Sequence, residues 1–117
     1  MNKRKTGTEY EERAAQWLVQ NGFQILERNY RCRSGEIDLI ARDGRYLVFV
    51  EVKYRADGRA GDPLEAVNWQ KQRRICRTAA WYCREKRLPE DQPCRFDVVG
   101  ILKTDIYHIK NAFDYAG

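Results

Sequence analysis

Residues 35–53 read GEIDLIARDGRYLVFVEVK, and this stretch decides what kind of sheet the chain can build. Apolar and polar residues alternate on either side of Asp43-Gly44, a pair that is typical of the tight turn of a β-hairpin. Three charged residues, Asp38, Glu51 and Lys53, interrupt the apolar positions of the two strands. Charges on half-buried strands destabilise a fold unless they are paired, hydrated or bound to a metal. The stretch therefore predicts a hairpin and, on it, a site.

The register of the hairpin decides which of these charges meet. With the turn centred on the Asp-Gly pair, Asp38 is expected opposite Phe49, and Glu36 opposite Glu51. Directly opposed residues share a face of the sheet, and so do residues two apart along one strand. Asp38, Glu51 and Lys53 should then emerge on one face. The two carboxylates are expected there as diagonal neighbours, about 7–8 Å apart at the backbone.

The flanking sequence predicts a layered α/β domain. A first helix is expected over about 8–21, ended by Gly22, and a second helical region over about 62–86, in which Asn68 could cap a second start. Turn-forming residues at 55–62 predict a mobile loop. Strands are expected at 23–32, in the hairpin, at 95–102 and at 106–110. The predicted order is α-β-β-β-α-β-β, with helices packed around one sheet.

Length, charge and composition narrow the class of protein. The 117 residues, 43% of them hydrophobic, fit a single domain over 1–117, and the net charge of +5 suits a polyanionic partner. No apolar run approaches the roughly 20 residues that cross a bilayer, so no membrane partner is expected. The basic N-terminus lacks the apolar segment of a signal peptide, which predicts a cytoplasmic protein. The four cysteines form no C-x-x-C pair, so free thiols are expected.

Two carboxylates that converge on one point suit a hard divalent cation. Mg²⁺ takes oxygen ligands at about 2.1 Å and often uses only one or two protein carboxylates together with water. Asp38 and Glu51 could supply them, and Lys53 could hold an attacking water or offset charge on a reacting phosphate. This set meets the needs of phosphodiester hydrolysis. The alternative is a solvated face on which Lys53 only pairs with a carboxylate; Glu36 opposite Glu51 weighs against it, because opposed like charges are destabilising.

The same residues resemble a known active-site signature. Asp38, followed by Glu51-x-Lys53, is similar to the signature of the PD-(D/E)xK nuclease superfamily, although Ile37 stands where the name has proline. The ordered blocks GEIDLIARD, FVEVKYR, KQRRICRTAAWY, RFDVV and HIKNAF resemble the YraN-like family of small bacterial endonuclease-like proteins, which are distantly similar to Holliday junction resolvases. The resemblance covers residues 7–113. It implies a restriction-endonuclease-like core, in which helices flank a central mixed β-sheet.

The resemblance also implies roles by position. Asp38 and Glu51 match the acids that bind Mg²⁺ or Mn²⁺, and Lys53 matches the catalytic lysine. Glu11 matches a glutamate that the family places on its first helix and directs toward the metal, although the residue before it departs from the family's usual glycine. The alternative for Glu11 is a capping box with Thr8, and both interpretations stay open.

Basic residues predict where a nucleic acid would lie. On the second helix Lys71, Arg74 and Arg77 fall close to one face, which could bind phosphates or could be an ordinary solvated surface. A second group flanks the predicted site and could touch the DNA backbone: Arg31, Arg33 and Arg55. Four large aromatic residues are expected in the core or an interface rather than under bases: Trp17, Trp69, Trp81 and Tyr82.

Three hypotheses for function follow. The first is a metal-dependent endonuclease-like enzyme that hydrolyses phosphodiester bonds in DNA, with branched or junction DNA as a candidate substrate. Symmetric resolution of a junction would need a homodimer. The second is a nucleic-acid-binding module that has a nuclease fold without turnover, against which the complete Asp38, Glu51 and Lys53 set argues. The third is an adaptor for another protein, which predicts no metal binding.

Overall fold

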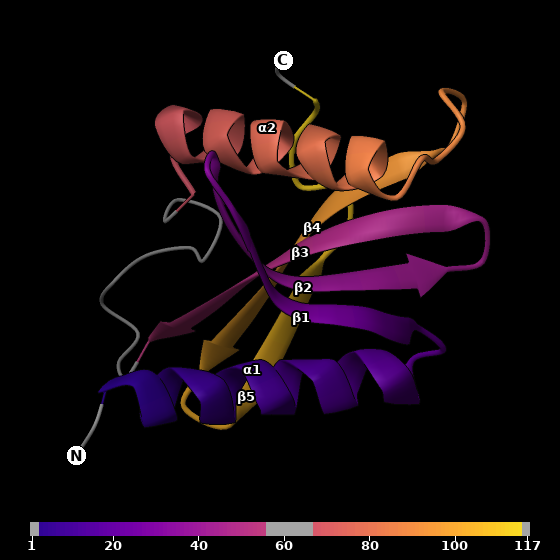
Figure 1. Cartoon of the computed structure of the whole chain (residues 1–117). Helices are drawn as coiled ribbons and strands as arrows, with labels where there is room; N and C mark the ends of the chain where they lie inside the picture. Colours follow the sequence, from indigo (N-terminus) through magenta and orange to yellow (C-terminus); the bar gives the residue numbers. More distant parts are fainter. Residues whose placement is uncertain (1–2, 56–66, 116–117) are drawn as a thin grey trace.

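The structure is a computed structural model that describes residues 3–55 and 67–115, with side chains from residue 9 onward except that of residue 55. Its elements follow the predicted order α-β-β-β-α-β-β, so the predicted α/β fold is confirmed (Figure 1). The helices are α1 (Lys3–Gln20) and α2 (Trp69–Glu85). The strands are β1 (Gln24–Cys32), β2 (Gly35–Asp43), β3 (Tyr46–Arg55), β4 (Cys94–Leu102) and β5 (Asp105–Ile109).

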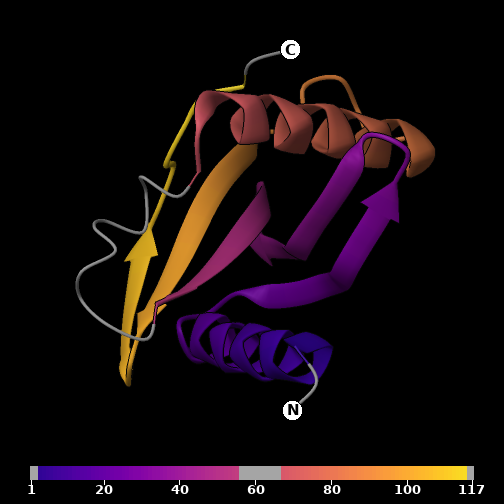
Figure 2. The same ribbon diagram turned by 90° about the vertical axis from the view of Figure 1, so that its left-hand side faces the viewer.

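The strands form one mixed sheet in the order β1-β2-β3-β4-β5. Neighbouring strands are antiparallel except β3 and β4, which are parallel. Parallel neighbours need a crossover connection, and here the chain passes through α2 between them. Figure 2 shows that α1 and α2 cover opposite faces of the sheet. No helix in the described ranges is long and apolar enough to cross a membrane.

Each face of the sheet has its own apolar core. Alternation along β3 sends Val48 and Val50 to the α1 side and Leu47 and Phe49 to the α2 side. The helical residues that face these cores are Ala14, Ala15 and Leu18 on α1, and Ile75, Cys76, Ala79 and Tyr82 on α2. Val19, the residue after Leu18, lies past the edge of the buried face of α1 and is exposed.

The helix ends are set by local hydrogen bonds. Gly22, at φ +92°, follows α1, and the Phe23 amide donates to the Leu18 carbonyl over 2.9 Å, as in a Schellman motif. α1 begins before Thr8, so the predicted capping box between Thr8 and Glu11 is wrong. The Asn68 side chain accepts a hydrogen bond from the amide at the third position of α2, which confirms its predicted cap. The predicted loop at 55–62 starts one residue too early, because Arg55 still belongs to β3. The rest of that loop and the predicted helical start at 62–66 lie outside the described residues.

The predicted hairpin turn is displaced by one residue. Asp43 pairs with Tyr46, so Gly44 and Arg45 form the turn instead of Asp43 and Gly44. Gly44 has a φ of +60° at the first turn position, whereas Arg45 has no positive φ. A type II′ turn requires a positive φ at its first central residue only, which glycine adopts without strain. The register therefore differs by two residues from the predicted one, and each side chain keeps its predicted face.

Candidate functional site

The candidate site lies where β2 and β3 separate. Their paired ladder ends at Leu39–Val50, and the next residues beyond this pair are Asp38 and Glu51. The Val52 amide donates to Asp38 Oδ2 over 2.8 Å, so a side chain takes the place of a strand partner. Figure 2 shows β1 and β2 bending away from β3 toward α2 at their far end. The separation leaves Asp38 and Glu51 side by side at the end of the ladder.

The displaced register changes the neighbours that were predicted for the acids. Phe49 pairs with Ile40, so the predicted pairing of Phe49 with Asp38 is wrong. Glu36 pairs with Arg31 on β1 instead of facing Glu51, and their side chains form an ion pair of 3.4 Å. Glu36 and Glu51 are therefore not directly opposed, and the repulsion predicted from such a pairing does not occur. Glu36 acts on the site only through its charge at longer range.

Asp38 is a partly buried acid with little compensation from the described residues. Burial, and then the charge of Glu51, raises the pKa of Asp38 to about 8, while the hydrogen bond from Val52 opposes the shift. Glu11 and Glu36 raise this pKa further through their charges. Within the described ranges Asp38 forms no ion pair. A cation bound here would remove both the desolvation and the repulsion that disfavour its ionised form.

Glu51 already meets two lysines. The side chain of Glu51 is buried, and its Oε1 lies 2.9 Å from Lys71 Nζ and 3.4 Å from Lys53 Nζ. Burial, and then the neighbouring Lys71, lowers the pKa of Lys53. The solvated-face alternative predicted the contact between Lys53 and Glu51, but Glu51 is only 7% exposed, which contradicts a solvated face. Asp38, Glu51, Lys53 and Lys71 thus form a partly buried cluster of two acids and two lysines.

Glu11 approaches the cluster from the other side of the sheet. It lies in a small hollow of about 120 Å³ that is also lined by Glu12, Arg28, Asn29 and Leu39. Burial raises the pKa of Glu11, the Asn29 side chain opposes this by hydrogen bonding, and the charges of Glu36 and Glu51 raise it further. Its Oε2 atom is buried with no hydrogen-bond partner among the described residues. The structure thus brings Glu11 within electrostatic range of the two acids, not into direct contact with them.

The four acids do not form a closed ligand cage. In the described part of the chain, no three His, Cys, Asp or Glu side chains are arranged to hold one metal ion. Asp38 and Glu51 alone match the way Mg²⁺ is bound by one or two carboxylates and several waters. Among the described residues Asp38 forms no ion pair and Glu11 Oε2 has no hydrogen-bond partner, which is consistent with an additional cation. The predicted metal and catalytic roles stay predictions.

Of the residues predicted to contact DNA, one belongs to the acid–lysine cluster and the other described ones lie on the surface. Lys71 points inward to Glu51, whereas Arg74 and Arg77 are exposed on α2. Arg33 is exposed at the β1–β2 turn, Arg31 pairs with Glu36, and the side chain of Arg55 lies outside the described set. Of the aromatic residues predicted in the core or an interface, Tyr82 is buried in the core and Trp17 is partly buried against it. Trp69 and Trp81 are exposed, so they are not core residues, and an interface role for them stays a prediction.

The sequence analysis did not predict the exposure of Trp69 and Trp81 or the backbone conformation of Asn29. Trp69, Arg73, Arg77 and Trp81 follow one another at intervals of four residues along the exposed side of α2, so the helical period alone could have placed the two indoles outside. Asn29, which bonds Glu11, has a φ of +51° next to a bulge in β1. Neither a bulge nor a positive φ at Asn29 had a clear sequence signal.

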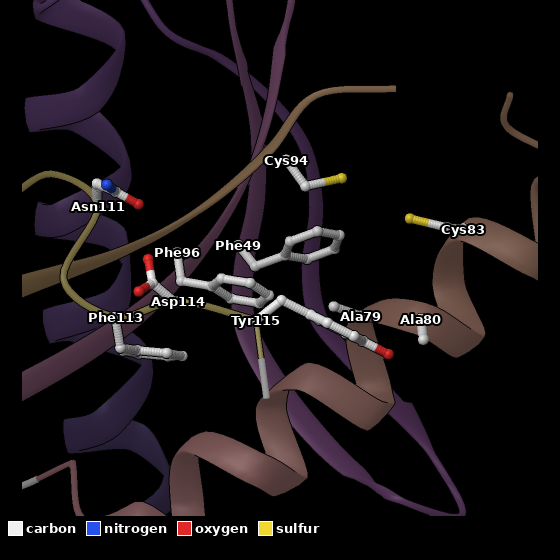
Figure 3. Close-up of a pocket in the computed structure, with 10 residues that line it drawn as sticks. All are labelled: Phe49, Ala79, Ala80, Cys83, Cys94, Phe96, Asn111, Phe113, Asp114 and Tyr115. Carbon is white, nitrogen blue, oxygen red and sulfur yellow. The ribbon is translucent and has the colours of Figure 1, made fainter. Parts of the chain in front are cut away.

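An apolar cavity of about 290 Å³ lies elsewhere, between α2, β3, β4 and the C-terminal segment. Figure 3 shows that its floor is built by aromatic rings, including Phe49 and Phe96, and that the sulfur atoms of Cys83 and Cys94 point toward each other at its rim. All four cysteines are free thiols, as predicted. None of the clustered acids and lysines lines this cavity, so it is separate from the candidate site.

Comparison with known proteins gives a family match over most of the chain. The model of the uncharacterised protein family UPF0102 matches residues 10–101. A UPF0102 protein of Lachnoclostridium phytofermentans is 58% identical over 117 residues, covering 100% of this chain and 99% of that protein. A UPF0102 protein of Klebsiella pneumoniae is 45% identical, covering 94% and 87%, and one of Chromohalobacter salexigens is 44% identical, covering 97% and 94%.

Proposed function

The chain belongs to the protein family UPF0102, which confirms the predicted YraN-like family, and we propose that it is a metal-dependent endonuclease-like enzyme acting on DNA. The observation that carries the proposal is Asp38, a partly buried carboxylate that adjoins Glu51 and forms no ion pair with any described residue. A fold has little reason to withdraw two acids from water together unless a cation joins them. The site supports phosphodiester hydrolysis better than it supports a structural role.

The residues of the cluster fit a divalent ion. Asp38 and Glu51 would hold Mg²⁺ or Mn²⁺, both of which prefer carboxylate oxygens. When bound, such an ion supplies Lewis-acid activation of a phosphate oxygen and of a water. Lys53, next to Glu51, orients the attacking water and stabilises the charge that develops on the phosphate. Glu11, at longer range, restrains a water or orients the ion's hydration shell.

Lys71 supports the presence of a cation position at Glu51. Its ammonium group lies 2.9 Å from Glu51 Oε1 and occupies space beside the acid pair. A compact positive charge there is what the acids require when no metal is bound. On the arrival of a metal or a phosphate, Lys71 is free to turn to the DNA backbone, as was predicted for it. Branched DNA and a homodimer are parts of the same proposal.

The alternative is a nucleic-acid-binding module without turnover. The ion pair between Lys71 and Glu51 is the observation that favours it, because a lysine that satisfies Glu51 permanently would replace a metal. The isolated Asp38 carboxylate favours the enzyme instead, because neither lysine reaches it in an ion pair. Metal binding and cleavage, measured separately, distinguish the two.

The test is a cleavage panel with matched variants. Purified protein would be incubated with linear duplex, single-stranded, flap and four-way-junction DNA, and with structured RNA, in Mg²⁺ and then in Mn²⁺. Glu51→Ala and Lys53→Ala are expected to abolish cutting, whereas Glu90→Ala, which removes an exposed acid from the loop after α2, should leave it unchanged. Cutting that survives in both site variants would refute the assigned roles. DNA binding without metal binding or cutting would favour the binding module.

A further inference from the structure

The outward face of α2 carries two exposed indoles among arginines. Trp69 is 60% and Trp81 is 49% exposed, although tryptophan is usually among the better buried side chains. Between them, at four-residue intervals, lie the exposed Arg73 and Arg77. We call these four residues the Trp-Arg face of α2; Arg74 and Arg84 lie beside it and are exposed as well. The two indoles are about 18 Å apart along the helix axis, at about 1.5 Å per residue.

The fold itself does not need this face. α2 is anchored to the sheet by its opposite side, where Ile75, Ala79 and Tyr82 are buried. Trp69 and Trp81 contribute little to that core and leave a large apolar surface in water. Exposed aromatic side chains that are grouped with arginines are typical of binding surfaces. The arrangement therefore indicates a partner that offers both flat rings and negative charge.

We propose that the Trp-Arg face binds the unpaired bases and phosphates of a single-stranded stretch of DNA. Indoles stack on bases, which is worth about 1–3 kcal/mol per base, and arginines pair with the phosphates between them. Bases inside a continuous duplex are already stacked on each other and offer no free ring to Trp69 or Trp81. The inference rests on the proposed function and adds the substrate class: DNA with a single-stranded portion, such as a flap or an open arm.

Other occupants fit this face less well. A second copy of the chain packed symmetrically on it would place Arg73 and Arg77 against the same arginines of its partner. An anionic membrane would require a continuous apolar stripe for insertion, but the apolar side of α2 is buried in the core and arginines separate the two indoles. Nucleic acid is the partner for which both the indoles and the arginines have a use.

The position of the face connects it to the acid cluster. Lys71, in the first turn of α2, reaches inward to Glu51, and Trp69 stands exposed only two residues before it. A strand that lies along the Trp-Arg face would thus pass the end of α2 nearest to Asp38 and Glu51. Unpaired bases would be held on the helix, and the backbone beside them would be presented to the cluster.

Tryptophan fluorescence tests the inference directly. The chain has three tryptophans, and the third, Trp17, is partly buried against the α1 core. Titration with an unlabelled oligothymidylate in EDTA, where metal-dependent cutting cannot contribute, is expected to quench the fluorescence of Trp69 and Trp81. A blunt-ended linear duplex, in which every base is paired, should quench it much less.

Variants separate stacking from charge. Trp69→Ala and Trp81→Ala should each weaken oligothymidylate binding about tenfold and change duplex binding less than about twofold. Arg73→Ala and Arg77→Ala should each weaken the binding of oligothymidylate and of duplex. Each should also reduce the slope of log affinity against log salt concentration by the amount expected for about one phosphate contact. Tyr107→Ala removes a comparably exposed aromatic ring (45% exposed) from β5 and should change neither affinity.

The outcomes also separate this inference from the proposed function. Unchanged oligothymidylate affinity in Trp69→Ala and Trp81→Ala would overturn the inference, and so would quenching by phosphatidylserine vesicles without quenching by DNA. If the protein cleaved continuous duplex and its indoles did not stack on bases, the inference would fail but the proposed enzyme would stand. Stacking without cleavage of any substrate would support the inference and overturn the proposed enzyme.

Discussion

Replacing Asp38 by asparagine is expected to stabilise the metal-free protein at alkaline pH. Burial and the charge of Glu51 raise the pKa of Asp38 from its ordinary 3.8 to about 8. The folded state therefore binds this proton more tightly than the unfolded chain does. Its contribution to stability is complete below pH 3.8 and is lost as the pH rises toward 8. An asparagine at this position can still accept the hydrogen bond from the Val52 amide, but it cannot ionise.

The expected magnitude follows from the same shift. One pKa unit corresponds to about 1.4 kcal/mol. Between about pH 5 and pH 8 the unfolded carboxyl is ionised and the folded one is mostly protonated, so the wild-type protein loses roughly 4 kcal/mol relative to Asp38→Asn. Because a domain of this size has a total stability of about 5–15 kcal/mol, the difference should be easy to measure.

Urea unfolding in EDTA at several pH values from about 5 to 9 measures this difference. Subtracting the wild-type free energy of unfolding from that of Asp38→Asn cancels the other titrating groups. Adding Mg²⁺ at the alkaline end should stabilise the wild-type protein more than the variant, because only the wild type keeps both acids. Asp91→Asn, at an exposed loop position, is the control. A difference between Asp38→Asn and wild type that stays constant across the range would refute the reasoning.

Three further predictions concern the neighbours of the site and the fold. Lys71→Met should tighten Mg²⁺ binding in a calorimetric titration, because Lys71 lies 2.9 Å from Glu51 and competes for its oxygen; weaker binding would mean that the lysine helps to hold the ion. Asp97→Ala should lower the free energy of unfolding by about 3–5 kcal/mol, because it removes a buried carboxylate that bonds Arg95, His108 and the Asn111 amide, although Arg95 keeps its ion pair with Asp43; a loss below about 1 kcal/mol would contradict this. Asn68→Ala should cost about 1 kcal/mol in urea unfolding through the lost cap of α2, and no loss would show that the cap is dispensable.

Helices, strands and their order were predictable because their signals are local. Val48 and Val50 alternate with Leu47 and Phe49, which identifies a strand with two apolar sides before any partner is known. Asn68 has the chemistry of an N-cap wherever the helix packs. The register is different, because it depends on which residue of the turn adopts a positive φ. Gly44 can stand second in a turn with Asp43, as predicted, or first in a turn with Arg45, as observed, so composition alone does not decide between the two registers.

The shared face of the acids survived this error for a geometric reason. A displacement of two residues returns every side chain to the same side of a strand, so Asp38, Glu51 and Lys53 stay together under either register. Their immediate partners differ from those predicted. Glu36 pairs with Arg31, and Glu51 pairs with Lys71, which lies on a helix more than a dozen residues further along the chain. Such contacts depend on how α2 packs across the sheet, which local pattern does not encode.

A second acid, Asp97, shows how this fold compensates a buried carboxylate. Asp97 accepts hydrogen bonds from Arg95 and His108, and these bonds outweigh the effect of burial and lower its pKa. Asp38, which is partly buried, accepts one main-chain hydrogen bond and has a raised pKa, while Lys53 and Lys71 both pair with Glu51. Among the described residues, fixed cations thus compensate Asp97, but none forms an ion pair with Asp38. A divalent ion shared with Glu51, as we propose, would supply the positive charge that these residues do not.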